Sequence, residues 1–207
     1  MLKKDLAMAD ENIMIDWEYS GKPDALMGNG ATRWEKVLVY MASFLGMALF
    51  TISYLNQTWD WEWWAYLIAG VIAADIFGGV VANALNTCKR FYHAPLKENE
   101  TGLTRRLKNP YFFSFLHVYP LLVALFYPPG NWMYGILWYA ALLISTVTLL
   151  RVPLYLQRPT AFLIISLAIT ANYYAIEPVS GFEWLVPMLF IKIIYGHLVR
   201  EEPYRPK

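Results

Sequence analysis

The fold of this chain is decided by residues 64–93, whose sequence is WAYLIAGVIAADIFGGVVANALNTCKRFYH. The stretch is long and apolar enough to cross a bilayer, for which about 20 residues suffice. It also contains polar or small residues spaced three or four positions apart, which places them on one face of an α-helix. These residues are Asp75, Gly79, Asn83, Asn86, Arg90 and His93. Because lipid excludes polar side chains, this face predicts a functional site within the membrane.

A neighbouring face of the same predicted helix carries a small residue at every fourth position. These residues are Gly70, Ala74, Gly78 and Ala82. Small side chains allow a second membrane helix to approach closely. We therefore expect this helix to pack against another helix through its small residues and to present the polar face beside that contact.

The composition is that of a membrane protein. Of the 207 residues, 57% are hydrophobic, 17% are aromatic and only 16% are charged, whereas about 25% of a soluble domain is charged. The formal net charge of +1 and the lack of a clustered basic arm argue against a nucleic-acid partner. A single cysteine, Cys88, excludes an intramolecular disulfide and a site made of several thiolates.

Six apolar segments, each close to the length of a membrane crossing, predict an all-α integral membrane bundle of six transmembrane helices. They lie near residues 37–56, 64–88, 110–127, 132–151, 159–176 and 182–199. We expect a cytoplasmic N-terminal arm over 1–35, a six-helix transmembrane domain over 36–200 and a cytoplasmic tail over 201–207. The prolines at positions 120, 153 and 187 are expected to bend three of the segments.

The positions of lysine and arginine predict the orientation of the bundle. All 17 of these residues are assigned to one side of a six-span chain, when Lys192 of the sixth segment is counted with the C-terminal part. They fall in the N-terminal arm, the second and fourth connections and the C-terminal part. Since cytoplasmic loops carry an excess of Lys and Arg, both termini are predicted to be cytoplasmic. The opposite side is expected to carry an aromatic belt, consisting of Trp59, Trp61, Trp63, Trp64, Trp132 and Trp184.

Three ionisable residues on different predicted helices fall at the same depth. Asp75, His117 and Lys192 each lie 10 or 11 residues from the outer end of their segments, which corresponds to roughly 15 Å, near the middle of the bilayer. We predict that Asp75 pairs with Lys192, with His117 as a neighbour or alternative partner. The group either locks the bundle as a structural ion pair or lines a cavity as catalytic acid and base groups. A Schiff-base lysine with a carboxylate counter-ion is a third alternative, which six spans and the sequence around Lys192 disfavour.

A second polar group is predicted nearer the cytoplasmic surface. Asn83, Asn86, Arg90 and Arg200 are candidate substrate-binding residues, because amide and guanidinium groups can orient a polar or phosphorylated lipid head. The structural alternative for the cations is interfacial anchoring, in which their side chains reach lipid phosphates.

The same region contains a candidate metal site. His197 and Glu201 are four residues apart and share a helix face, and His93 is expected nearby. One carboxylate and two imidazoles are ligands that zinc or non-haem iron accepts, so a divalent metal is the candidate cofactor. The sequence lacks HExxH and repeated histidine boxes, and interfacial anchoring of His93 is the alternative.

Three functions fit these features. The first is an enzyme that acts on a lipid or isoprenoid by acid/base chemistry in a polar intramembrane cavity open to the cytoplasmic side. The second is a small proton-coupled carrier, for which a homodimer would supply the symmetry that the sequence lacks. The third is a structural or assembly protein whose ion pair only specifies packing. Membrane lipid is the expected partner in each case.

Overall fold

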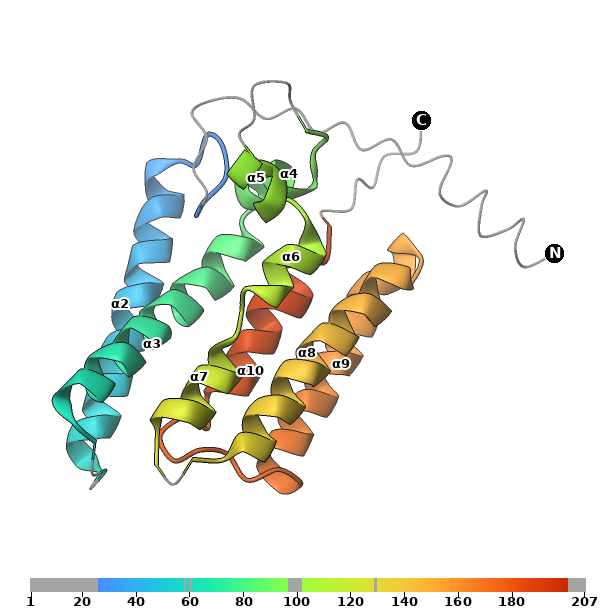
Figure 1. Ribbon diagram of the computed structural model, residues 1–207. Helices are drawn as coiled ribbons and strands as arrows, with labels where there is room; N and C mark the ends of the chain where they lie inside the picture. Colours follow the sequence, from blue (N-terminus) through green and yellow to red (C-terminus); the bar gives the residue numbers. More distant parts are fainter. Residues whose placement is uncertain (1–25, 58, 60, 97–101, 129, 201–207) are drawn as a thin grey trace.

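The computed structural model describes residues 26–57, 59, 61–96, 102–128 and 130–200, and their regular secondary structure is entirely helical (Figure 1). Four helices are long and apolar enough to cross a membrane. They are α2 (Arg33–Asn56), α3 (Trp63–Ala84), α8 (Trp132–Arg151) and α9 (Leu154–Tyr174). The prediction of an all-α chain is confirmed, and these four helices support a location in the membrane.

The remaining elements are shorter. They are α4 (Asn86–His93), α5 (Gly102–Leu107), α6 (Pro110–Phe115), α7 (Tyr119–Phe126), α10 (Leu185–Phe190) and a π-helix, η1 (Ile191–His197). The predicted third segment is interrupted at residues 116–118, between α6 and α7. The predicted sixth segment consists of α10 and η1, which together span residues 185–197. Both segments are therefore shorter apolar helices than the sequence pattern suggested.

The prediction of one continuous polar helix from Asp75 to His93 is wrong. Helix α3 ends at Ala84, because Leu85 adopts an extended conformation with φ −65° and ψ 138°. Helix α4 then starts in a new direction at Asn86 (Figure 1). The break is held by tertiary contacts, since Thr87 Oγ1 donates to the carbonyl oxygen of Met27 at 2.9 Å. Only the residues up to Asn83 share a face with Asp75.

Helices α2 and α3 pack closely through small residues, as predicted. A Cβ atom added at Gly78 would collide with the Ser43 side chain, and Gly70 lies near Met47. Helix α2 begins with a capping box, in which Glu35 N donates to Thr32 Oγ1 and Thr32 N donates to the Glu35 carboxylate. This box fixes the start of α2 beside α3.

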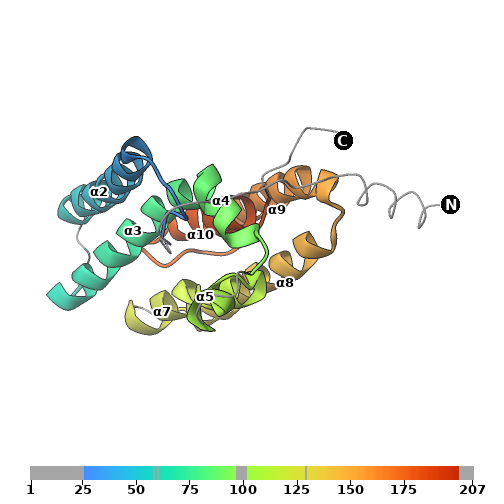
Figure 2. The ribbon, with the colours of Figure 1, turned by 90° about the horizontal axis from the view of Figure 1, so that it is seen from above.

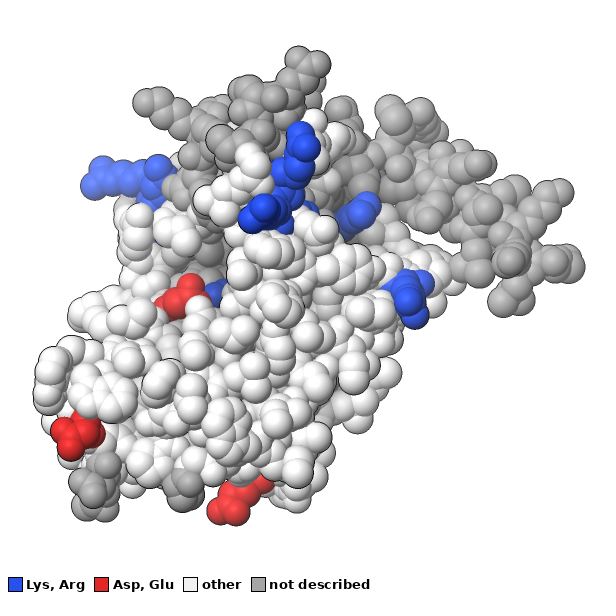
Figure 3. All heavy atoms as spheres, viewed as in Figure 1, with Lys and Arg blue, Asp and Glu red and all other residues white. Residues whose placement is uncertain are grey.

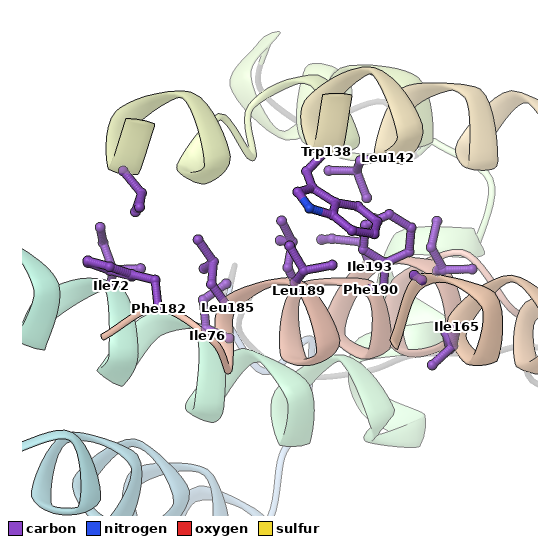
Figure 4. Packing of buried hydrophobic residues seen from close by; sticks show 14 of the residues in the cluster. Ile72, Ile76, Trp138, Leu142, Ile165, Phe182, Leu185, Leu189, Phe190 and Ile193 are labelled. Atoms are coloured by element: carbon purple, nitrogen blue, oxygen red, sulfur yellow. The ribbon is translucent and has the colours of Figure 1, made fainter. Parts of the chain in front are cut away.

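The core of the bundle surrounds α10 and η1. Leu185, Leu189 and Ile193 are fully buried, and α3, α8 and α9 lie around them (Figure 2). Trp138 and Leu142 of α8 approach Phe190 and Ile193 from one side in Figure 4. The last apolar segment is thus the central element, which explains why its hydrophobic residues show no exposed face.

Charged residues lie mainly at the two ends of the bundle. In Figure 3, lysines and arginines gather near the end where α4 and α5 lie, and acidic side chains appear toward the other end. We call these the basic end and the opposite end. Large apolar side chains between them are exposed, including Phe44 at 62%, Ile144 at 66% and Leu163 at 59%. Exposed apolar surface on several long helices is what a membrane protein presents to lipid.

Candidate functional site

An ion pair between α3 and η1 lies in the otherwise uncharged middle of the bundle. Lys192 Nζ lies 2.5 Å from Asp75 Oδ2, and it also donates to the Asp75 carbonyl oxygen at 3.4 Å. The predicted Asp75–Lys192 pair is therefore present. The lysine side chain is 5% exposed but the aspartate side chain is 40% exposed, so the carboxylate is the more accessible partner. Figure 3 shows an acidic and a basic side chain together in a recess of this face.

The lysine reaches the carboxylate by crossing Gly79. A Cβ atom at residue 79 would lie only 2.8 Å from Lys192 Nζ, so the lysine side chain could not keep its present position if residue 79 carried one. Asn83, one turn further along α3, donates from Nδ2 to the Lys192 carbonyl oxygen at 3.2 Å. Gly79 thus leaves space for the Lys192 side chain, and Asn83 fixes the backbone of η1 at residue 192.

A π-helix carries the lysine. At the end of this π-helix, Leu198 N donates to the carbonyl oxygen of Ile193, five residues earlier. Hydrogen bonds over five residues are characteristic of a π-helix. Segments of π-helix are rare and often occur at functional sites. Gly196 allows η1 to lie against Asn83, since a Cβ atom there would be 3.1 Å from the Asn83 Cβ. Nothing in the sequence pattern predicted this element.

Tyr119 is a site residue that the sequence analysis did not identify. Its hydroxyl donates to Asp75 Oδ2 at 2.7 Å. Helix α7 begins at Tyr119, directly after the interruption at residues 116–118 and next to Pro120. The only sequence signal was this proline, which was expected to disturb the helix beside His117.

His117 lies in the interruption and lines the same cavity as the ion pair. Its Nδ1 is 2.8 Å from the carbonyl oxygen of Phe113. Because a carbonyl oxygen only accepts, Nδ1 carries a proton, and in the neutral tautomer with this hydrogen bond Nε2 is the acceptor nitrogen. Within the described part of the chain, no protein group is bonded to this nitrogen. His117 therefore offers a proton acceptor.

These residues border a cavity of about 570 Å³. Its walls come from residues 26–27, α2, α3, α4, the end of α5, the chain around α6 and α7, and η1. The residues with polar side-chain groups in the lining are Tyr40, Ser43, Asp75, Asn83, Tyr92, His117, Tyr119 and Lys192. The remaining lining is mostly apolar or aromatic, and a concave apolar site with a few convergent polar groups is the usual form of a small-molecule site.

The other predicted substrate-binding residues do not line this cavity. Asn86 is exposed at the start of α4, Arg90 lies on the same short helix, and Arg200 is exposed at the end of the described chain. The break at Leu85 separates the first two from Asp75. Of the four predicted residues, Asn83 alone is in the lining, and its amide is bonded to the π-helix.

Helix α4 is anchored to the end of η1. Lys89 Nζ donates to the carbonyl oxygens of Gly196 and Val199, at 2.9 and 2.5 Å. His93 Nε2 lies 2.7 Å from the carbonyl oxygen of His197. Burial lowers the pKa of His93 to about 4, and the nearby cations Arg200 and Lys89 act in the same direction. His93 is therefore neutral at physiological pH, and its Nε2–H donates to His197.

The described residues of the predicted metal site are not arranged as a metal-binding group. His93 and His197 do lie close, with ring centroids 6.0 Å apart, but the His197 ring stacks on Phe113 at 3.6 Å. Glu201 lies outside the described residues. Among the residues that the structure describes, no group of three or more His, Cys, Asp or Glu side chains is arranged to hold a metal ion. Zinc or iron binding therefore gains no support.

No protein-family model matches this chain, and no curated protein or solved structure shows significant similarity to it.

Proposed function

We propose that this protein is a membrane enzyme that acts on a lipid or isoprenoid by acid/base chemistry. The observation that carries the proposal is the cavity at mid-height of the bundle, in which the Asp75–Lys192 pair, Tyr119 and His117 converge within a mainly apolar lining. Ionisable residues buried in a membrane protein usually mark a functional site, because placing them there is costly.

The proton-transferring groups are Asp75 and His117. Lys192 and Tyr119 both donate to Oδ2 of Asp75, and no donor among the described residues binds its Oδ1. That oxygen and Nε2 of His117 are the two acceptors that face a bound substrate. Lys192 balances the charge of the carboxylate and holds it in position through the contact with Oδ2. Such a pair of bases suits the removal or relay of a proton from a substrate hydroxyl, amine or activated carbon.

Access from the bilayer supports a lipid substrate. Asp75 is 40% exposed although it lies far from both ends of α3, so the cavity opens sideways toward the surface that lipid covers. Val71, Ala74 and Leu116 provide an apolar lining beside the carboxylate. A long apolar chain can enter along this side while its polar head reaches Asp75. The apolar lining favours a lipid or isoprenoid over a small polar solute.

Lipid mass spectrometry tests the proposal. The full-length protein is purified in an uncharged maltoside detergent, its retained lipids are identified, and it is incubated with a membrane lipid extract and a polyprenol mixture. We expect a retained lipid or isoprenoid to be consumed and a new mass to appear. The Asp75→Asn/Lys192→Met double variant is the matched control, because it removes both charges and leaves neither unpaired. If the lipid is retained but not converted, a carrier is favoured. If the lipid is neither retained nor converted, a structural role is favoured.

The proposed topology has six crossings, with α6–α7 and α10–η1 as the third and sixth, and both termini in the cytoplasm. The support is that, among the residues that the structure describes, the lysines and arginines outside η1 lie at the basic end, as the positive-inside rule requires. The cavity then reaches toward the cytoplasmic side, where Leu26, Met27 and Leu107 line it.

Reporter fusions test this topology. After Lys207, we expect a reporter that works only in the cytoplasm to be active. At residues 128–131, we expect activity from a reporter that works only outside the cytoplasm. A fusion at residues 177–181 should behave like the second. If the two ends of the bundle gave the same result, the six-span arrangement would be wrong.

A further inference from the structure

A second cavity, of about 390 Å³, lies at the opposite end of the bundle. It is formed between α2 and the segment that precedes α10, and it shares no lining residue with the cavity around Asp75. Its walls include four aromatic side chains and one carboxylate. These are Phe50, Trp59, Phe77, Trp184 and Glu183. Asp75, His117, Tyr119 and Lys192 do not line this cavity.

The aromatic rings form a connected wall. The ring centroid of Phe50 lies 6.4 Å from that of Trp59 and 6.4 Å from that of Trp184. Phe77 continues the wall, with its centroid 5.6 Å from Trp184. The ring planes of Phe50 and Trp184 are inclined by 67°. Phe50 and Trp59 are nearly parallel, at 22°, whereas Phe77 and Trp184 are inclined by 43°. The wall therefore turns at Trp184, and a space bordered on two sides in this way suits a compact ligand.

The carboxylate is fixed at this wall by the chain around Gly181. Gly181 N donates to Glu183 Oε1 at 3.1 Å, and Trp184 Nε1 donates to the Gly181 carbonyl oxygen at 2.9 Å. Gly181 has φ +87°, and a Cβ atom there would lie 2.7 Å from the Trp61 ring. A residue other than glycine would therefore disturb the turn that holds Glu183 beside the rings.

The charge of this end favours a cation. The sequence of the three connections at the opposite end, residues 56–63, 128–131 and 177–181, contains no lysine or arginine. In the part of the chain that the structure describes, no basic side chain forms a salt bridge with Glu183. An anionic head group would meet an unbalanced carboxylate, whereas a cation would be attracted by both the carboxylate and the π faces.

We infer that this cavity binds a quaternary ammonium group. Aromatic walls with a nearby carboxylate are suited to such cations, which offer no hydrogen-bond donor and interact through charge and dispersion. Ser53, Gln57 and Ser180 are polar lining residues, while Gly46 and Leu49 lie further along α2 toward its middle. The cavity therefore accepts a cationic head at its polar rim, carried either by a soluble choline-type molecule or by a lipid.

Choline binding tests this inference in the full-length protein held in an uncharged maltoside detergent. Isothermal titration calorimetry is used with choline and with 3,3-dimethylbutan-1-ol, its uncharged isostere. Choline is expected to bind at least tenfold more tightly than the isostere, since only the cation gains from the carboxylate and the rings. Equal binding of the two compounds, or no binding of choline together with no retained phosphatidylcholine, would overturn the inference.

Matched variants locate the binding. Glu183→Gln and Trp59→Leu are each expected to weaken choline binding by roughly 5- to 30-fold. Glu177→Gln and Trp132→Leu, which alter exposed residues at the same end but outside the cavity, should bind as the wild type does. If Glu183→Gln keeps the wild-type elution profile and the wild-type affinity, the inference fails. Added phosphatidylcholine displaces choline if the natural source is a lipid and leaves it bound if the source is soluble.

Discussion

Replacing Asp75 by asparagine is expected to lower the turnover of the lipid substrate by about 10²- to 10⁴-fold, which is the usual contribution of a positioned acid or base. Asparagine keeps the size of the side chain and can still accept the hydrogen bond from Tyr119. It cannot take up a proton, and it carries no charge to balance Lys192. The measurement is the rate of appearance of the product mass per mole of folded protein.

The same substitution is also expected to affect stability, so the two effects must be separated. Removing one partner of a buried ion pair costs about 3–5 kcal/mol, because the other charge remains without compensation. Lys192 is the more deeply buried partner, with 5% of its side chain exposed against 40% for Asp75. Asp75→Asn should therefore destabilise the protein more than Lys192→Met does.

The double variant Asp75→Asn/Lys192→Met completes the comparison. It leaves no unpaired charge, and its thermal unfolding in detergent is expected to approach that of the wild type while its turnover stays low. A double variant with wild-type turnover would contradict the catalytic assignment. Single variants as stable as the wild type would show that the pair is not buried in the way the structure describes.

Substituting Gly79 by alanine is expected to separate Lys192 from Asp75 without altering either residue. The added Cβ would overlap the lysine side chain, 2.8 Å from Nζ and 2.9 Å from Cδ. The end of the lysine side chain must then shift from its position beside the carboxylate. Because this side chain is flexible and Asp75 is 40% exposed, the loss of stability is expected to be smaller than the loss of about 3–5 kcal/mol for a broken, fully buried pair. Helix propensity acts the other way by about 1 kcal/mol, since alanine favours a helix more than glycine does. Thermal unfolding of the purified protein measures the net loss.

Gly70 provides the control for this prediction, because it lies in the same helix and its added Cβ would come no closer than 4.0 Å to Met47. Gly70→Ala is expected to leave stability unchanged or to raise it by up to about 1 kcal/mol. Equal behaviour of the two variants would mean that the space at Gly79 is not required. A loss of turnover in Gly79→Ala that exceeds its loss of folded protein would indicate that the position of the lysine matters for the reaction.

The ion pair was predictable from the sequence because depth in a membrane follows from counting residues. Asp75 and Lys192 are far apart in the chain but equally far from the outer ends of their segments, and a lone charge at that depth is costly. Tyr119 was not predictable in the same way. Tyrosine is common in membrane proteins, and only the interruption of the helix at residues 116–118 turns its hydroxyl toward Asp75.

The break at Leu85 is the point at which the helix predicted from the residue spacing differs from the structure. The spacing from Asp75 to His93 fits one helix face, and neither proline nor glycine occurs between residues 80 and 93 to signal an end. Tertiary contacts decide the outcome, because Thr87 binds the Met27 carbonyl and Lys89 binds the end of η1. These bonds stabilise α4 in a new direction and remove Asn86, Arg90 and His93 from the face that carries Asp75.

By itself, the sequence determined the helical class, the apolar segments, the small-residue contact of α3 and the pairing of Asp75 with Lys192. Each of these depends on local composition or on regular spacing along a helix, which the chain carries wherever it is placed. Only the tertiary structure decided the break after α3, the π-helix that contains Lys192, the space that Gly79 leaves for the lysine side chain, and the two cavities. These features depend on contacts between residues that are distant in the chain, and such contacts leave no periodic pattern in the sequence.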